Sequence, residues 1–189
     1  MSTDNKIIVW MQVSLDGRAS GPGGAFDWPV VGPELTTYFL GGLRGAGLFC
    51  YGAEVYRGMA AYWPTADEES GADEYQVAFS RLWKPMPKLV FSHNLDTTEW
   101  NTTVAADIDA IRSFADNADG DAYVFGGATV VGELIRRDLI DEYQLFVHPV
   151  VLGDGAPLFP DLDERRQVRL AGSRVYDDSV ISMRYVRER

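Results

Sequence analysis

The chain has 189 residues, 46% of them hydrophobic, which is enough for a single domain (1–189) with a sizeable core. Its 17 Lys and Arg residues and 28 Asp and Glu residues give a net charge of −11, which argues against binding to nucleic acid or to an anionic membrane surface. The single cysteine, Cys50, excludes an internal disulfide framework and a cysteine zinc cluster, and we expect no metal site.

The first predicted element is a buried strand over Lys6–Ser14, where an Ile- and Val-rich run is interrupted by Gln12. The run is too short for a signal peptide, and no apolar run approaches the ~18 residues of a membrane-spanning helix. We therefore expect a cytoplasmic protein. A glycine-rich loop, Leu15–Gly24, follows the strand.

The next predicted elements alternate between helix and strand. Pro33 is a favourable first-turn residue for a helix through about Leu43. We expect a strand over Gly47–Tyr51 and, after Gly52, a helix over Ala53–Ala61. The acidic stretch Asp67–Glu74 predicts a solvated turn and the start of a helix.

Lys88–Ser92 predicts a further strand, and Trp100–Val104 is another candidate strand. The spacing of apolar residues predicts a helix over Asp107–Asn117. Near the end, Val168–Tyr176 and Val180–Arg187 flank two aspartates, which predicts an antiparallel hairpin. Together the elements indicate an α/β fold: a mixed sheet covered by helices on both faces.

The most informative stretch is centred on Gly126-Gly127. Ala122–Phe125 predicts a short buried strand, and a helix begins directly after the glycine pair and runs to Arg137. A helix N-terminus presents free N–H groups and suits a phosphate, and glycine allows a ligand to approach the backbone closely. A tight turn between strand and helix explains the same pattern equally well. A strand over Tyr143–Val151 and a loop over Leu152–Phe159 follow.

Four motifs, in order, carry a family resemblance: Ser14-Leu-Asp-Gly17, Gly58-Met-Ala-Ala-Tyr-Trp-Pro64, Phe125-Gly-Gly127 and His148-Pro-Val-Val-Leu-Gly-Asp-Gly-Ala-Pro-Leu-Phe159. The chain resembles the dihydrofolate reductase superfamily. The branch it most resembles is the stand-alone form of the C-terminal reductase domain of the bifunctional riboflavin-biosynthesis deaminase-reductase. The resemblance implies a three-layer α/β fold with a mixed, mostly parallel sheet, and a nicotinamide cofactor, NADPH or NADH, across the carboxyl ends of the strands.

The resemblance also implies which residues hold the cofactor. They are Gly52, Ala53, Val55, Ser92, His93, Gly126, Gly127, Ala128 and Thr129. Family members commonly have Gly-Arg-x-Thr where this chain has Gly52-Ala-Glu-Val55, and often an arginine where it has His93. An arginine provides a permanently charged, bidentate phosphate contact. We therefore expect weak discrimination between NADPH and NADH, with His93 as the nearby cation and Arg57 or Arg18 as alternatives.

Two carboxylates are candidates for the catalytic role. Asp16 would orient the substrate ring or relay a proton, or it would simply cap the turn before Gly17. Asp27 would face the pocket instead. His148, which precedes a proline in a predicted strand, is expected to be structural, and Tyr62 and Trp63 to form core or pocket wall.

The chain lacks the zinc motifs of the deaminase half, H-x-E and P-C-x-x-C, so it is at most a reductase module. We expect a nicotinamide-dependent reductase of a small heterocyclic substrate of the ribosylamino-pyrimidine type. The alternative is a non-catalytic protein of the same fold that binds another nucleotide or a flavin. Relatives of this kind are often homodimers, so we expect a homodimer that acts on a small molecule.

Overall fold

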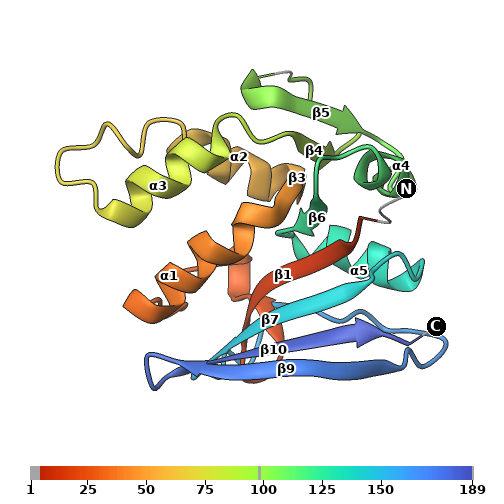
Figure 1. Ribbon diagram of the computed structural model, residues 1–189. Helices are drawn as coiled ribbons and strands as arrows, with labels where there is room; N and C mark the ends of the chain where they lie inside the picture. Colours follow the sequence, from red (N-terminus) through yellow and green to blue (C-terminus); the bar gives the residue numbers. More distant parts are fainter. Residues whose placement is uncertain (1–4, 98, 189) are drawn as a thin grey trace.

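The computed structural model describes residues 5–97 and 99–188. Its centre is an eight-stranded sheet in the order β5-β4-β3-β6-β1-β7-β10-β9 (Figure 1). The first six strands in that order are parallel, and β10 runs antiparallel to both β7 and β9. The predicted sheet, mixed and mostly parallel with a C-terminal hairpin, is confirmed.

The strands of the large sheet are β1 (Ile7–Ser14), β3 (Ala46–Gly52), β4 (Lys88–Phe91), β5 (Thr102–Ala105), β6 (Asp121–Val124), β7 (Glu142–His148), β9 (Val168–Tyr176) and β10 (Val180–Arg187). A separate small sheet pairs β2 (Arg18–Ser20) with β8 (Ala156–Pro157). The helices are α1 (Pro33–Gly42), α2 (Ala53–Tyr62), α3 (Glu74–Trp83), α4 (Ala110–Asp116) and α5 (Ala128–Arg136). Short 3-10 turns lie at Pro22–Gly24, Leu43–Gly45 and Glu99–Asn101.

Side chains alternate across β1 and divide the core into two halves. Val9 and Met11 belong to the half that includes residues of α4 and α5, whereas Ile8 and Trp10 belong to the half that includes residues of α1, α2 and α3. The two groups of helices lie on opposite faces of the sheet (Figure 1). Because both faces are covered, β1 is apolar almost throughout, which is why it could be recognised from the sequence.

Several predicted boundaries differ from the structure. The predicted loop Leu15–Gly24 contains β2, which pairs with β8 inside the second predicted loop. Strand β7 ends at His148 and not at Val151, because Pro149 has no N–H to donate and Val150 N turns back to His148 O at 2.8 Å. The second candidate strand, predicted over Trp100–Val104, is β5, which starts two residues later after a 3-10 turn.

The acidic stretch 67–74 is only partly a solvated turn. The predicted helix start is correct, since α3 begins at Glu74 behind Asp73, whose side chain accepts from Gln76 N at 2.7 Å in a capping box. Asp67, however, accepts hydrogen bonds from Ser80 Oγ at 2.9 Å and Lys84 Nζ at 2.7 Å. This part of the stretch therefore ties the preceding loop to α3.

The hairpin turn fixes the start of α1. The two carboxylate oxygens of Asp177 accept from Glu34 N at 3.0 Å and Leu35 N at 3.1 Å. A Cβ added at Gly32 would lie 2.3 Å from Cγ of Asp177, so the approach needs glycine. The C-terminal hairpin and α1 thus hold one another in place on one face of the sheet.

Candidate functional site

The chain topology brings the predicted cofactor-binding residues to one edge of the sheet. Strands β4, β3 and β6 are parallel neighbours, so their carboxyl ends align. Gly52 ends β3, Ser92 follows β4, and Gly126 follows β6 by two residues. Residues that are far apart in the sequence therefore meet here, as the resemblance implied.

The glycine pair forms the centre of this edge. The Gly126–Gly127 peptide bond is cis, and Gly126 has φ +106°. Gly126 O accepts a hydrogen bond of 2.6 Å from Gly52 N, which joins the two turns. A Cβ at Gly126 would lie 3.2 Å from Sδ of Met11, whereas one at Gly127 would meet only Val55 Cγ2, at 3.6 Å. Gly126 is thus required by the fold, and Gly127 leaves room for a ligand.

Two helices begin side by side at this edge with free N–H groups. The N-caps of α2 and α5 are Gly52 and Gly127, and neither has a side chain to cap the helix. Ala53 begins α2, and Ala128 and Thr129 begin α5. By contrast, carboxylates satisfy the first turns of α1 and α3. Two uncapped, adjacent helix N-termini favour an anion such as the diphosphate of a dinucleotide.

The rest of this edge offers little positive charge. Arg57 is ion-paired with Glu54 on the exposed side of α2. His93 is exposed, and Ser92 Oγ accepts from Asn94 N at 3.2 Å and Leu95 N at 3.0 Å. The edge therefore fits a diphosphate, but among residues 5–97 and 99–188 it provides no unpaired arginine beside α2 for an additional phosphate.

Asp16 joins two loops. Its carboxylate accepts from Ser14 Oγ at 2.7 Å, Leu152 N at 3.1 Å and Gly153 N at 2.9 Å. The hydrogen bond from Ser14, with those from the two backbone amides, lowers the pKa of Asp16 to about 2. A carboxylate held in this way is ionised at neutral pH. These contacts support the turn-capping role of Asp16 over that of a proton donor.

Asp27 lies in a different place, at a cavity of about 450 Å³. The cavity is bounded by Gln12 of β1, by the segment that contains Asp27, by Phe39 of α1 and by Tyr75 of α3. Gln12 lies near the carboxyl end of β1, and β1 pairs in parallel with β6, so the cavity and the glycine pair lie at the same edge of the sheet. This volume is within the ~300–1,000 Å³ usual for small-molecule sites. Sequence reasoning proposed Asp27 but missed Gln12.

His148 is structural, in keeping with expectation. It is fully buried, and its Nδ1 accepts from Val30 N at 3.0 Å. This bond holds the segment that contains Asp27 against the sheet. Trp63 packs against Phe79 and Tyr75 in the same half of the molecule, as predicted for a core or wall residue.

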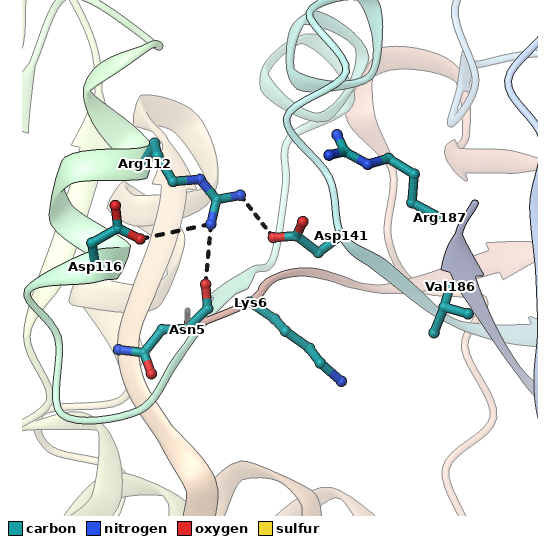
Figure 2. Close-up of a pocket in the computed structure, with 7 residues that line it drawn as sticks. All are labelled: Asn5, Lys6, Arg112, Asp116, Asp141, Val186 and Arg187. Atoms are coloured by element: carbon teal, nitrogen blue, oxygen red, sulfur yellow. Dashed lines mark hydrogen bonds and ion pairs between the residues drawn. The ribbon is translucent and has the colours of Figure 1, made fainter. Parts of the chain in front are cut away.

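A second hollow, of about 430 Å³, lies at the opposite, amino-terminal end of β1 (Figure 2). Arg112 dominates it and contacts Asn5 O at 3.1 Å, Asp141 at 2.7 Å and Asp116 at 3.8 Å. Lys6 pairs with Glu142 at 3.0 Å. These cations are already paired with carboxylates. The ion pairs of Arg112 connect α4 to the sheet, and we assign the hollow no ligand.

Other classes of site find no support in the described part of the chain. Within residues 5–97 and 99–188, no group of three or more His, Cys, Asp or Glu side chains is arranged to hold a metal ion. No helix in these ranges has the length and apolarity needed to cross a bilayer.

The sheet order and the glycine edge define a protein of the dihydrofolate-reductase-like fold. The family model described as "RibD C-terminal domain" matches residues 5–182, and the chain belongs to this family. Among curated relatives, the uncharacterized protein YyaP of Bacillus subtilis is 28% identical over 185 residues, which cover 95% of this chain and 94% of YyaP.

Two solved structures support the fold. A protein of Shewanella sp. PV-4 that is assigned by name to riboflavin biosynthesis superposes with a TM-score of 0.73 at 21% identity, covering 97% of this chain and 99% of that one. Dihydrofolate reductase from Enterococcus faecalis, solved with NADP(H), gives a TM-score of 0.66 at 16% identity, covering 98% of each chain. The predicted family and fold are confirmed.

Proposed function

We propose that this protein is a nicotinamide-dependent reductase of a small heterocyclic substrate, related to the riboflavin-pathway reductases. The observation that carries the proposal is the pair of uncapped helix N-termini, α2 and α5, joined through Gly52 and Gly126 beside a small-molecule cavity. Membership of the RibD C-terminal domain family supports the reductase class.

In this proposal the chain's own residues bind and orient. The N–H groups of Ala53, Ala128 and Thr129 and the open side of Gly127 would hold the diphosphate, with Val55 packed beneath the glycine. When bound, a nicotinamide cofactor would supply the hydride. Asp16 fixes the loop after β1 to Leu152 and Gly153, and Asp27 would be the carboxylate at the substrate cavity. A homodimer is part of the same proposal.

The test measures the melting temperature of the protein in titrations with NADPH, NADH and FMN. A ligand that binds the folded state raises the apparent stability. Either nicotinamide dinucleotide should raise the melting temperature, and FMN alone should not. If FMN stabilises the protein and neither dinucleotide does, the alternative of a repurposed flavin-binding protein replaces the reductase.

Gly127→Val should weaken dinucleotide binding at least about tenfold, or roughly 1.4 kcal/mol, while the chain still folds. The native φ of −73° is open to other residues, and a Cβ meets only Val55 at 3.6 Å, so the side chain would obstruct the ligand and not the fold. Gly41→Val, at an exposed position where a Cβ meets nothing within 4 Å, is the matched control. Unchanged dinucleotide affinity in folded Gly127→Val would show that the glycine pair is not the binding site.

A further inference from the structure

The cavity beside Asp27 has one wall without regular secondary structure. Residues 26–31 form neither helix nor strand, and Phe26, Asp27, Pro29 and Val31 line the cavity. The other lining residues belong to β1, α1 and the start of α3, and they are Gln12, Thr36, Phe39, Asp73 and Tyr75. The segment 26–31 is thus the part of the wall that can move without disturbing a helix or the sheet.

A hydrogen bond to His148 joins this segment to the sheet. Val30 N donates to Nδ1 of His148, which ends β7, at 3.0 Å. Among residues 5–97 and 99–188, no other hydrogen bond connects the segment to a strand of the large sheet, and the indole of Trp28 donates to Ala25 O of the same loop. Val30 and Val31 are 50% and 43% exposed, so burial of apolar side chains adds little. The attachment of this wall therefore depends on His148.

His148 can hold the segment only as a neutral ring. An imidazole nitrogen accepts a hydrogen bond only when it carries no proton, whereas both nitrogens of the charged ring are donors. The ring is fully buried, Trp28 packs edge-on against it, and its Nε2 has no partner in the part of the chain that the structure describes. A proton on Nδ1 would set two donors against each other and bury a charge. Both costs are relieved when the segment moves away.

The groups around the ring do not favour its charged form. In the adjoining strands, β1 places Ser14 beside His148 and the register of β10 brings Val180 beside it, and both are uncharged. The titratable groups of the loop after β1, the segment, α1 and the hairpin turn are Asp16, Asp27, Glu34, Tyr38, Asp177 and Asp178. None of them has a hydrogen bond to the ring. Burial therefore decides, and it lowers the pKa of His148 from 6.5 to about 4.

We propose that His148 is a pH-dependent switch, which keeps the segment 26–31 closed over the cavity while the ring is neutral and releases the segment when the ring gains a proton. Below pH 6.5 the open state becomes progressively more populated, because the opened ring binds a proton that the closed ring excludes. His148 acts through Val30 and is thus a positioning residue for the cavity wall. This switch is independent of the ligand that the cavity takes.

Hydrogen exchange of single backbone amides, measured by NMR on the full chain at pH 7.5 and 5.5, tests the switch. The protection factor of the Val30 amide, which is corrected for the intrinsic effect of pH on exchange, should fall about tenfold between these values. Gly153 N donates to the carboxylate of Asp16 at 2.9 Å, and that carboxylate, with a pKa of about 2, stays ionised throughout. The Gly153 amide should therefore keep its protection factor. A constant protection factor for Val30, or an equal fall at Gly153, would overturn the switch.

Variants separate the switch from a merely structural contact. In His148→Asn an amide oxygen takes about the place of Nδ1 and accepts from Val30 N but does not titrate, so the Val30 protection factor should be equal at both pH values. His93→Asn changes the exposed histidine and should retain the tenfold fall. If His148→Asn retains the fall, or His93→Asn loses it, the titrating group is not His148.

Should His148→Asn fail to fold, the ring of His148 is titrated by NMR in the parent protein. A ring pKa well below 6.5, together with the fall in Val30 protection, supports the switch. A ring pKa near 6.5 in the folded protein contradicts it.

Proteolysis shows whether the segment moves as a whole. Chymotrypsin cleaves after aromatic residues, and the segment offers Phe26, whereas Trp28 precedes Pro29, which blocks cleavage. Cleavage after Phe26 is followed by mass spectrometry and normalised to a peptide substrate at each pH. Because cleavage follows the population of the open form, it should be about tenfold faster at pH 5.5 than at pH 7.5 in the parent and equal in His148→Asn. An equal rate in the parent at both values would mean that the segment stays closed, and the switch would be rejected.

Discussion

His148 is a buried side chain that can accept its hydrogen bond only when the ring is uncharged. Its Nδ1 accepts from Val30 N at 3.0 Å, so the ring proton is on Nε2, which is buried without a partner among the described residues. Trp28 packs edge-on against the ring, at 5.6 Å between centroids. Burial lowers the pKa of His148 to about 4. A charged ring would lose the bond to Val30 and release the segment that walls the cavity.

This gives a signed pH prediction. The folded pKa is below the usual 6.5 of the unfolded chain, so between these values the unfolded state binds more protons. The contribution of His148 to the free energy of unfolding should be fully present above pH 6.5 and should decrease toward pH 4. Between pH 7.5 and 5 the decrease should be roughly 1–2 kcal/mol. Urea unfolding of His148→Gln should lack this part of the decrease, whereas the exposed His93→Gln should retain it. The same slope in both variants would contradict the role given to His148.

Individual residues of the candidate site differ in how far their role could be predicted from the sequence. The glycine pair, Asp16 and Asp27 were all proposed from local motifs and the family resemblance. Gln12 had a visible signal, as the one polar residue in the apolar run of the first strand. Asp73 had none, because its place at the cavity depends on how α3 packs against α1 and β1, which local sequence does not determine.

At the scale of elements, the first turn of α2 would decide between NADPH and NADH at the proposed site. Ala53 and Val55 provide neither charge nor hydroxyl, and Arg57 is occupied by Glu54. The dipole at the N-terminus of α2 attracts an anion, and the diphosphate that it would attract is present in both NADPH and NADH. We therefore expect NADPH and NADH to bind within about tenfold of one another at pH 7.5.

Ala53→Arg should raise NADPH affinity about tenfold and leave NADH affinity nearly unchanged, because only NADPH has a 2′-phosphate for the new guanidinium. Both dissociation constants are measured by fluorescence titration. Ala61→Arg adds the same charge at the exposed C-terminal end of α2 and should change neither. A strong NADPH preference in the parent protein would indicate that another cation already reaches the phosphate. His93→Ala, measured at pH 7.5 and 5.5, tests whether that cation is His93.

The elements themselves were predicted where a local period defines them. The hairpin Val168–Tyr176 and Val180–Arg187 has the predicted bounds, because strands and turn are contiguous and Asp177 and Asp178 take the positive φ of a tight turn. The β2–β8 pair was missed because it joins two loops more than a hundred residues apart. Such pairing depends on the tertiary fold and leaves no period in the sequence.

At the scale of the whole molecule, the sheet carries exposed apolar side chains on one face beside the edge strand β9. Strand β9 is the outermost strand beside β10 (Figure 1). Leu170, Val175 and Ile181 are 53%, 54% and 45% exposed. Ile181 pairs with Val175 and with Val147, so these residues share the sheet face that α5 covers further along. An exposed apolar face beside an unpaired edge strand favours association with another surface.

We therefore expect a homodimer with this face at its twofold interface. Analytical ultracentrifugation at micromolar concentration should give twice the 21.0 kDa chain mass. Val175→Lys combined with Ile181→Lys should weaken association at least about a hundredfold and give monomer, since the charges would be desolvated on both sides of the interface. Val151→Lys, 67% exposed on the loop after β7, should leave the dimer intact. If the parent protein sediments only as monomer, the dimer prediction is wrong. If the double variant still sediments as dimer, the interface lies on another face.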